Sequence, residues 1–234
     1  MPLRSSALML RCLAAVVLTA ALPGAALAFK DARSEEIASC LAGEQQTWGD
    51  GRDAPSARAA WRFVYRHEGA PAWFSAAQVL GVLEQAARAW APCGVPVQVI
   101  DAAAAQQRAP DAAQGQVLVL WSDSEVRGNF AAAHLGRQLL ALSPAMFALL
   151  RQRNPQYPAR ETLQMAVSHE MGHFLGLVAH SRRCVDVMSY YDDGKGQRCS
   201  LRDPAALKAH IEYRASLPTA CDIQRCRSAN GLAR

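Results

Sequence analysis

The sequence is organised around residues 169–180, whose first half has the pattern of a helix. On a helix, His169 and His173 lie four residues apart on one face, where two imidazoles can reach the same metal ion. Glu170 lies about 100° further round the axis, beside such an ion rather than under it. The pattern predicts a helix over residues 160–175 that carries two metal ligands and a neighbouring carboxylate. Its core face, opposite the metal side, would consist of Leu163, Val167, Met171 and Phe174.

A third ligand at His180 requires the chain to turn back after this helix. In a continuous helix His180 would lie about 16 Å along the axis from His169, too far for zinc–nitrogen bonds of about 2 Å. Gly176 is where the turn costs least, because glycine enters left-handed conformations without a Cβ penalty. We therefore predict that His180 returns to the metal. Asp186 remains an alternative third ligand, because a carboxylate also binds zinc.

Residues 1–28 have the pattern of a secretory signal peptide. Arg4 and Arg11 accompany an apolar run over residues 12–22, and the small-residue segment Ala26-Leu27-Ala28 follows. The apolar run is short for a membrane span. We therefore predict cleavage after Ala28 and export to the periplasm or to the outside of the cell, without stable membrane association afterwards.

Six cysteines follow the predicted cleavage site, and an even number in an exported chain favours disulfides over free thiols. The sequence alone does not choose among the possible pairings. Proximity suggests Cys184 with Cys199 and Cys221 with Cys226, which leaves Cys40 with Cys93.

Composition divides the rest of the chain into two parts. Residues 29–56 are polar and contain several charges and glycines, so we expect a loosely ordered N-terminal extension or a short pro-segment. Residues 57–234 are enough for one domain with its own core. The formal net charge of +5, without a dense basic run, gives no reason to expect nucleic-acid binding.

The expected elements alternate in an order that indicates an α+β fold. A strand over residues 60–65 precedes a helix that begins after Ser75. Apolar strands follow at residues 95–100 and 117–121, and a shorter pair at 130–135 and 138–142 includes an edge strand. This order predicts a twisted, mostly parallel sheet with helices on one side.

The segment Val187-Met188-Ser189-Tyr190 follows the histidine stretch. Together with the helix motif it resembles the metzincin clan of zinc endopeptidases, in which a His-Glu-x-x-His-x-x-Gly-x-x-His motif precedes a tight turn around a methionine. The resemblance implies a backing helix, a central zinc-binding helix, a methionine turn in which Met188 packs beneath one catalytic Zn²⁺, and a C-terminal helix. The sequence departs from the motif at one place: Ala179 occupies the position of the family's third histidine, and His180 lies one residue further on.

The same resemblance implies an activity for residues 57–234, that of a secreted zinc endopeptidase. His169, His173 and His180 would hold the ion, Glu170 would be the general base, and Tyr190 would help to stabilise the oxyanion. The substrate would be a protein or peptide bound in extended form along an edge strand, for which residues 130–135 are our candidate. We expect a monomer.

Two other functions fit the same residues. The first is a secreted zinc-binding module without peptidase activity. The second is a zinc hydrolase outside the metzincin clan, with Glu212 as the third ligand. The carboxylate of Glu170 weakens the first alternative, because a purely structural zinc site needs no base beside the metal.

Overall fold

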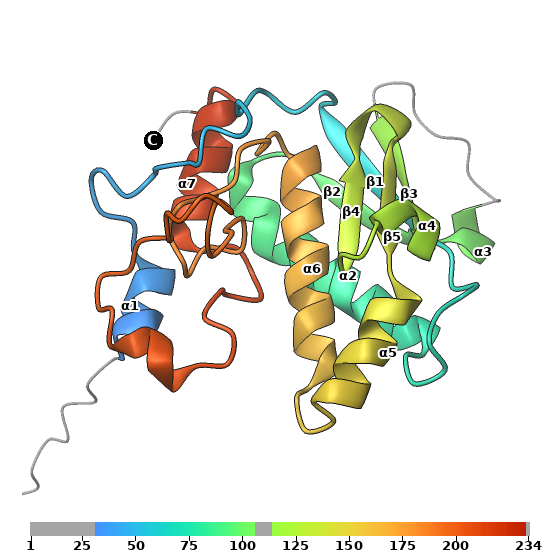
Figure 1. The fold of residues 1–234 in the computed structure, drawn as a ribbon. Coiled ribbons are helices and arrows are strands. Elements are labelled where there is room, and N and C mark those ends of the chain that lie inside the picture. Colours follow the sequence, from blue (N-terminus) through green and yellow to red (C-terminus); the bar gives the residue numbers. More distant parts are fainter. Residues whose placement is uncertain (1–30, 106–113, 233–234) are drawn as a thin grey trace, which may run out of the picture.

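The computed structural model describes residues 31–105 and 114–232, so the predicted signal peptide lies outside the described residues (Figure 1). Its helices are α1 (Ala32–Ala38), α2 (Ala76–Trp90), α3 (Ala102–Ala105), α4 (Asp123–Val126), α5 (Pro144–Arg153), α6 (Ala159–Phe174) and α7 (Ala220–Ala229). Short 3-10 turns are η1 (Ala91–Cys93), η2 (Leu135–Arg137) and η3 (Ala206–Ala209). Its strands are β1 (Ala60–Tyr65), β2 (Val97–Asp101), β3 (Gln114–Trp121), β4 (Ala131–His134) and β5 (Leu139–Leu142).

The five strands form one sheet in the order β2-β1-β3-β5-β4. Strands β2, β1, β3 and β5 pair in parallel, and β4 pairs antiparallel with β5 at the edge of the sheet. Strand β1 lies in the middle of the parallel part, and Phe63 is fully buried between neighbours. The predictions of a mostly parallel sheet and of an edge strand near residues 130–135 are confirmed.

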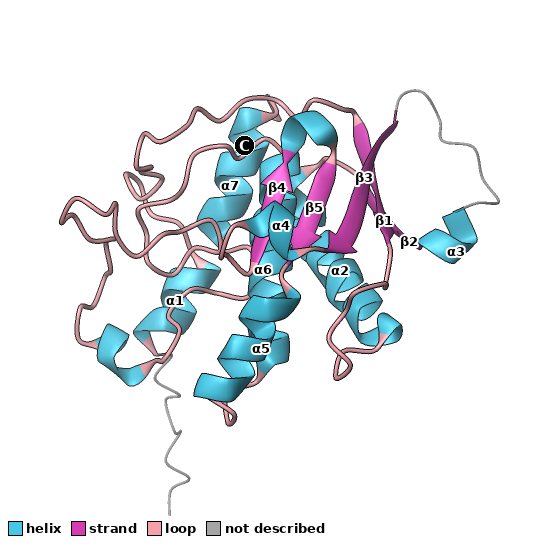
Figure 2. Ribbon diagram, turned by 45° about the vertical axis from the view of Figure 1, so that its right-hand side comes forward, coloured by secondary structure: helices cyan, strands magenta, loops and turns pink. Residues whose placement is uncertain are grey.

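Helices α2 and α6 pack against each other and against the sheet, as Figures 1 and 2 show. Helix α2 begins at the predicted cap, where Ser75 and Gln78 form a reciprocal capping box. Near its end the indole of Trp90 donates a buried hydrogen bond of 2.9 Å to the carbonyl oxygen of Ser168 in α6. Because this contact satisfies two buried polar groups, it fixes the height of α6 relative to α2.

Helix α5 is missing from the elements that we predicted. Ser143 caps it through a hydrogen bond from the backbone N–H of Met146, and Pro144 occupies its first turn. Both are ordinary helix-start signals, so the sequence contained the information. Only Phe147 is fully buried along this helix, which explains why its apolar periodicity is weak.

Three disulfides cross-link the described residues, and two of our three suggested pairings are wrong. Cys184 pairs with Cys199 as predicted, but Cys40 pairs with Cys221 and Cys93 with Cys226. Cys221 and Cys226 both lie in α7 and project about 140° apart around its axis, so they cannot reach each other. Each instead joins α7 to a distant segment. Disulfides are typical of oxidising, exported environments.

Residues 31–56 are more ordered than we predicted. They contain α1, whose Glu36 is buried, and an extended segment that pairs with residues near His180. The Cys40–Cys221 disulfide joins them to α7. Local composition suggested a loose extension because the partners of this segment lie more than a hundred residues away in the sequence. None of the helices in the described part of the chain is long and apolar enough to cross a membrane.

Candidate metal centre

Helix α6 is largely buried and carries the first two histidines, His169 and His173. The four predicted core residues of this helix, Leu163, Val167, Met171 and Phe174, are all buried. His169 and His173 project from the other side, with ring centroids 5.0 Å apart. The sequence pattern therefore identified both faces of the helix.

Gly172 lets the predicted methionine pack directly against α6. A Cβ at Gly172 would collide with the sulfur of Met188 and press on the indole of Trp90. Met188 itself is fully buried. Gly172, at a position that the motif leaves open, thus has a packing role beneath the histidines.

The helix stops at Phe174, close to the predicted position, in a Schellman motif whose left-handed residue is Gly176. The backbone N–H of Leu177 donates to the carbonyl oxygen of Gly172, and that of Gly176 donates to His173. Gly176 has a φ of +105°, and a Cβ there would collide with the carbonyl oxygen of Ala54. Both the backbone conformation and the close neighbour therefore require glycine at this turn.

The turn returns His180 to the other two histidines. Its ring centroid lies 5.1 Å from that of His169 and 5.0 Å from that of His173. The three side chains offer ligand atoms that all lie within 4.8 Å of one another, so the group could hold a metal ion. The extra residue before His180 is absorbed by the loop.

Each imidazole is fixed through Nδ1 by an acceptor. Nδ1 of His169 lies 2.7 Å from the carbonyl oxygen of Val187, and Nδ1 of His173 lies 2.6 Å from that of Leu177. Nδ1 of His180 lies 2.6 Å from a carboxylate oxygen of Asp50. Carbonyl and ionised carboxylate oxygens accept only, so each Nδ1 carries the hydrogen and each Nε2 keeps its lone pair.

The Nε2 atoms of His169 and His180 lie only 3.2 Å apart. Burial lowers the pKa of both rings, and it lowers the pKa of His173 to about 4, so the neutral forms prevail at neutral pH. Two neutral rings with hydrogens on Nδ1 then point lone pairs at each other. Tetrahedral zinc with bonds of about 2.05 Å places two nitrogen ligands about 3.3 Å apart. The donor set therefore fits a zinc ion.

Glu170 lies beside the histidines in a cleft of about 530 Å³. Three residues of the edge strand β4, Ala131, Ala132 and Ala133, form one wall of this cleft. Burial raises the pKa of Glu170 to about 8, and a hydrogen bond with the backbone of Ala133 opposes that shift. The carboxylate is therefore a poorly solvated group placed between the histidines and an open sheet edge.

Tyr190 also lines the cleft, and the residue is 44% exposed. It stacks on His180 with ring centroids 3.8 Å apart and planes inclined by 19°. Burial raises the pKa of the phenol, and the charge of nearby Glu170 adds to the shift. The hydroxyl is therefore protonated at neutral pH and can donate a hydrogen bond into the cleft.

The two alternative ligands lie outside the histidine group. The buried carboxylate of Asp186 accepts hydrogen bonds from Ser181, Arg183 and Thr219. Glu212 pairs with Arg214 at 2.8 Å and accepts from the hydroxyl of Tyr191. The structure therefore gives no support to the alternatives in which Asp186 or Glu212 is the third ligand, because neither belongs to the converging group and their oxygens have other partners.

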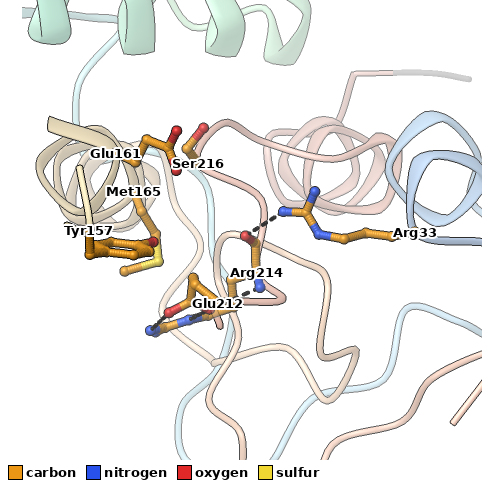
Figure 3. Close-up of a pocket in the computed structure, with 7 residues that line it drawn as sticks. All are labelled: Arg33, Tyr157, Glu161, Met165, Glu212, Arg214 and Ser216. Carbon is orange, nitrogen blue, oxygen red and sulfur yellow. Dashed lines mark hydrogen bonds and ion pairs between the residues drawn. The ribbon is translucent and has the colours of Figure 1, made fainter. Parts of the chain in front are cut away.

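A smaller pocket of about 240 Å³ adjoins the cleft and shares Met165 and Arg214 with it (Figure 3). Arg33 of α1 donates to the carbonyl oxygen of Arg214 at 2.8 Å, so the N-terminal segment braces this wall. Glu161 also lines the pocket. Met165 and Arg214 thus line both the cleft and a polar pocket beside it.

Sequence reasoning missed the residues that hold the loop of His180. Asp50 bonds to His180, and Asp53 bonds to Ala179 and to Arg225 of α7. The only local signal was the motif Gly49-Asp50-Gly51, which indicates a turn and nothing more. No periodicity links these aspartates to a histidine about 130 positions away.

Comparisons with known proteins give little further guidance. No family model matches the sequence, and no curated protein matches it. Among solved structures, one similar chain belongs to the "GM1 bound form of the ECX AB5 holotoxin". It is 12% identical, the match covers 74% of this chain and 80% of that one, and the TM-score is 0.44. A likeness this weak carries no inference about fold or function.

Proposed function

We propose that this chain is an exported, zinc-dependent endopeptidase of the metzincin type. The observation that supports it most is the convergence of three imidazoles beside Glu170. Their hydrogens are held on Nδ1, and two Nε2 lone pairs face each other at 3.2 Å. A bound zinc ion would supply a Lewis acid that lowers the pKa of an attacking water and would favour the ionised form of Glu170.

Glu170 is the base in this proposal. Its ionised carboxylate takes a proton from the attacking water and then carries it to the leaving amine, as peptide hydrolysis requires. Its position beside Ala133 of β4 brings the proton carrier next to the sheet edge that borders the cleft. Substitution of this one carboxylate should therefore abolish hydrolysis without removing a histidine.

Strand β4 holds the substrate in this proposal. Its inner edge pairs with β5, and its residues line the cleft. An extended peptide can add to such an edge through main-chain hydrogen bonds, which favour any sequence in an extended form. Tyr190, protonated and half-exposed in the cleft, can donate a hydrogen bond to the developing oxyanion.

The test compares the purified chain with Glu170→Ala and with a matched control, Glu84→Ala. Glu84 is an exposed carboxylate on α2, outside the cleft. All three proteins are loaded with zinc, assayed for bound metal, and incubated with casein. We expect equal zinc in all three, cleavage by the parent and by Glu84→Ala, and a loss of at least about a thousandfold in Glu170→Ala.

Two outcomes would contradict the proposal. Zinc binding by the parent without cleavage of casein would favour a zinc-binding module instead. Undiminished cleavage by Glu170→Ala would remove the proposed base. His180→Ala, assayed for zinc alone, should bind zinc far more weakly, because it removes one of three ligands.

A further inference from the structure

Residues 46–54, here called the N-terminal strap, run alongside the loop of residues 176–182 that carries His180. Three backbone hydrogen bonds join them, from Arg182 to Gln46, from Trp48 to His180 and from Ala54 to Gly176, at 2.9, 3.0 and 3.1 Å. Thr47 and Ser181 form an antiparallel bridge. The strap therefore contacts the loop at Gly176, His180, Ser181 and Arg182.

Asp50 of the strap holds His180 at two points. One carboxylate oxygen accepts from the backbone N–H at 3.0 Å, and the other accepts from Nδ1 at 2.6 Å. A carboxylate offers two acceptor oxygens, whereas an amide offers only one. The pair of contacts therefore fixes both the backbone position and the ring orientation of the histidine, and aspartate is required for both.

Asp53 of the same strap contacts the loop backbone and α7 rather than His180. Its carboxylate accepts from the backbone N–H of Ala179 at 3.0 Å and pairs with Arg225 at 2.8 Å. Arg225 also donates to the carbonyl oxygen of Ala179. Asp53 therefore ties the loop to α7 without touching an imidazole, which makes it a natural comparison for Asp50.

We propose that Asp50 is a positioning residue for the metal centre. It holds the hydrogen of His180 on Nδ1 and aims Nε2 at the other two histidines, and so sets the affinity for a divalent metal. The strap is then part of the metal centre, although residues 29–56 have the composition of a leader. The inference rests on the metal site of the proposed function, but not on peptidase activity.

The reason lies in the origin of the three ligands. His169 and His173 come from one helix, and a hydrogen bond from each Nδ1 to a backbone carbonyl oxygen orients each ring. His180 comes from an irregular loop, where a free side chain would populate several rotamers. A hydrogen-bonded partner on the distal nitrogen of a metal-binding histidine typically contributes 10–100-fold to affinity.

The test measures zinc affinity of the full chain by competition with a chelator, without any substrate. We compare Asp50→Asn with the same substitution at the neighbouring carboxylate, Asp53→Asn. We expect zinc affinity about 10–100-fold weaker in Asp50→Asn and less than about fivefold weaker in Asp53→Asn. The visible spectrum of the cobalt-substituted protein should change only in Asp50→Asn, because only that variant frees the imidazole.

Thermal unfolding of the metal-free proteins shows whether the variants fold. Should Asp50→Asn fail to fold, the parent alone decides the matter through ¹H–¹⁵N spectra of its histidines with zinc bound. We expect a hydrogen on Nδ1 of His180. Absence of that hydrogen would overturn the proposal, as would unchanged zinc affinity in Asp50→Asn, equal losses in both variants, or a parent that binds no zinc. Normal zinc results without casein cleavage would overturn only the proposed function.

Discussion

The two halves of the metal centre are built in different ways. Helix α6 supplies His169 and His173 from a regular element whose hydrogen bonds are local and whose core face packs on α2 and the sheet. The loop of residues 176–182 supplies His180 and depends on the N-terminal strap and on α7. A metal site can thus combine ligands that short-range sequence fixes with one that only the complete fold fixes.

This difference indicates which part of the site depends on distant segments of the chain. The contacts of the loop with Asp50 and Asp53 span 130 and 126 positions in the sequence. Contacts between residues so far apart in the sequence form only when the chain is folded, because closing a long loop costs conformational entropy that a single contact does not offset. Damage to the strap or to α7 should therefore affect His180 and leave α6 intact.

The largest effect should come from Gly176→Ala at the junction of the two halves. The φ of +105° disfavours alanine, and the new Cβ would collide with the carbonyl oxygen of Ala54, so the strap must move. We expect the free energy of unfolding to fall by about 4 kcal/mol, measured by denaturant titration. Gly128→Ala is the control, because its φ is +88° but open space surrounds it. Equal losses in both variants would contradict the role of the strap contact.

A somewhat smaller effect should come from Arg225→Met in α7. This change leaves Asp53 and the carbonyl oxygen of Ala179 without their buried partner. We expect a loss of about 3 kcal/mol in the free energy of unfolding. Arg227→Met on the same helix removes a more exposed contact and should cost less than about 1 kcal/mol. Similar values for the two arginines would show that the loop does not depend on α7.

The smallest effect should be a pH dependence at Glu44, two residues before the strap. Arg202 holds the pKa of Glu44 down at about 2, against an ordinary value of 4.5. The ion pair therefore stabilises the fold fully above pH 4.5, and the contribution disappears as the pH falls through 2. Allowing for solvent screening, we expect about 1–2 kcal/mol. In denaturant titrations at several pH values, Glu44→Gln should lose this amount at pH 6 and match the parent near pH 2.

The same contrast explains what the sequence could reveal. The periodicity of α6, the cap at Ser75 and the glycine at Gly176 are local signals, and each predicted its element correctly. The convergence of His180 followed from the geometry of zinc bonds rather than from any local pattern. Asp50 could not be found in this way, because nothing in the Gly-Asp-Gly turn indicates a partner.

The wrong disulfide predictions have the same cause, because the true partners lie 181 and 133 positions apart in the sequence. Pairing by proximity succeeded for Cys184 and Cys199, which close a short loop. It failed for Cys221 and Cys226, because both lie in one helix whose geometry keeps neighbouring thiols apart. A sequence-based prediction of one helix over both Cys221 and Cys226 would have excluded a disulfide between them.

The central claim is that helix and loop together complete one zinc site with three imidazoles. Zinc K-edge X-ray absorption on the metal-loaded chain measures this directly. We expect three imidazole ligands and one oxygen at about 2.0–2.1 Å, with one imidazole lost in His180→Ala. Two imidazoles in the parent, or a spectrum unchanged by His180→Ala, would contradict the account.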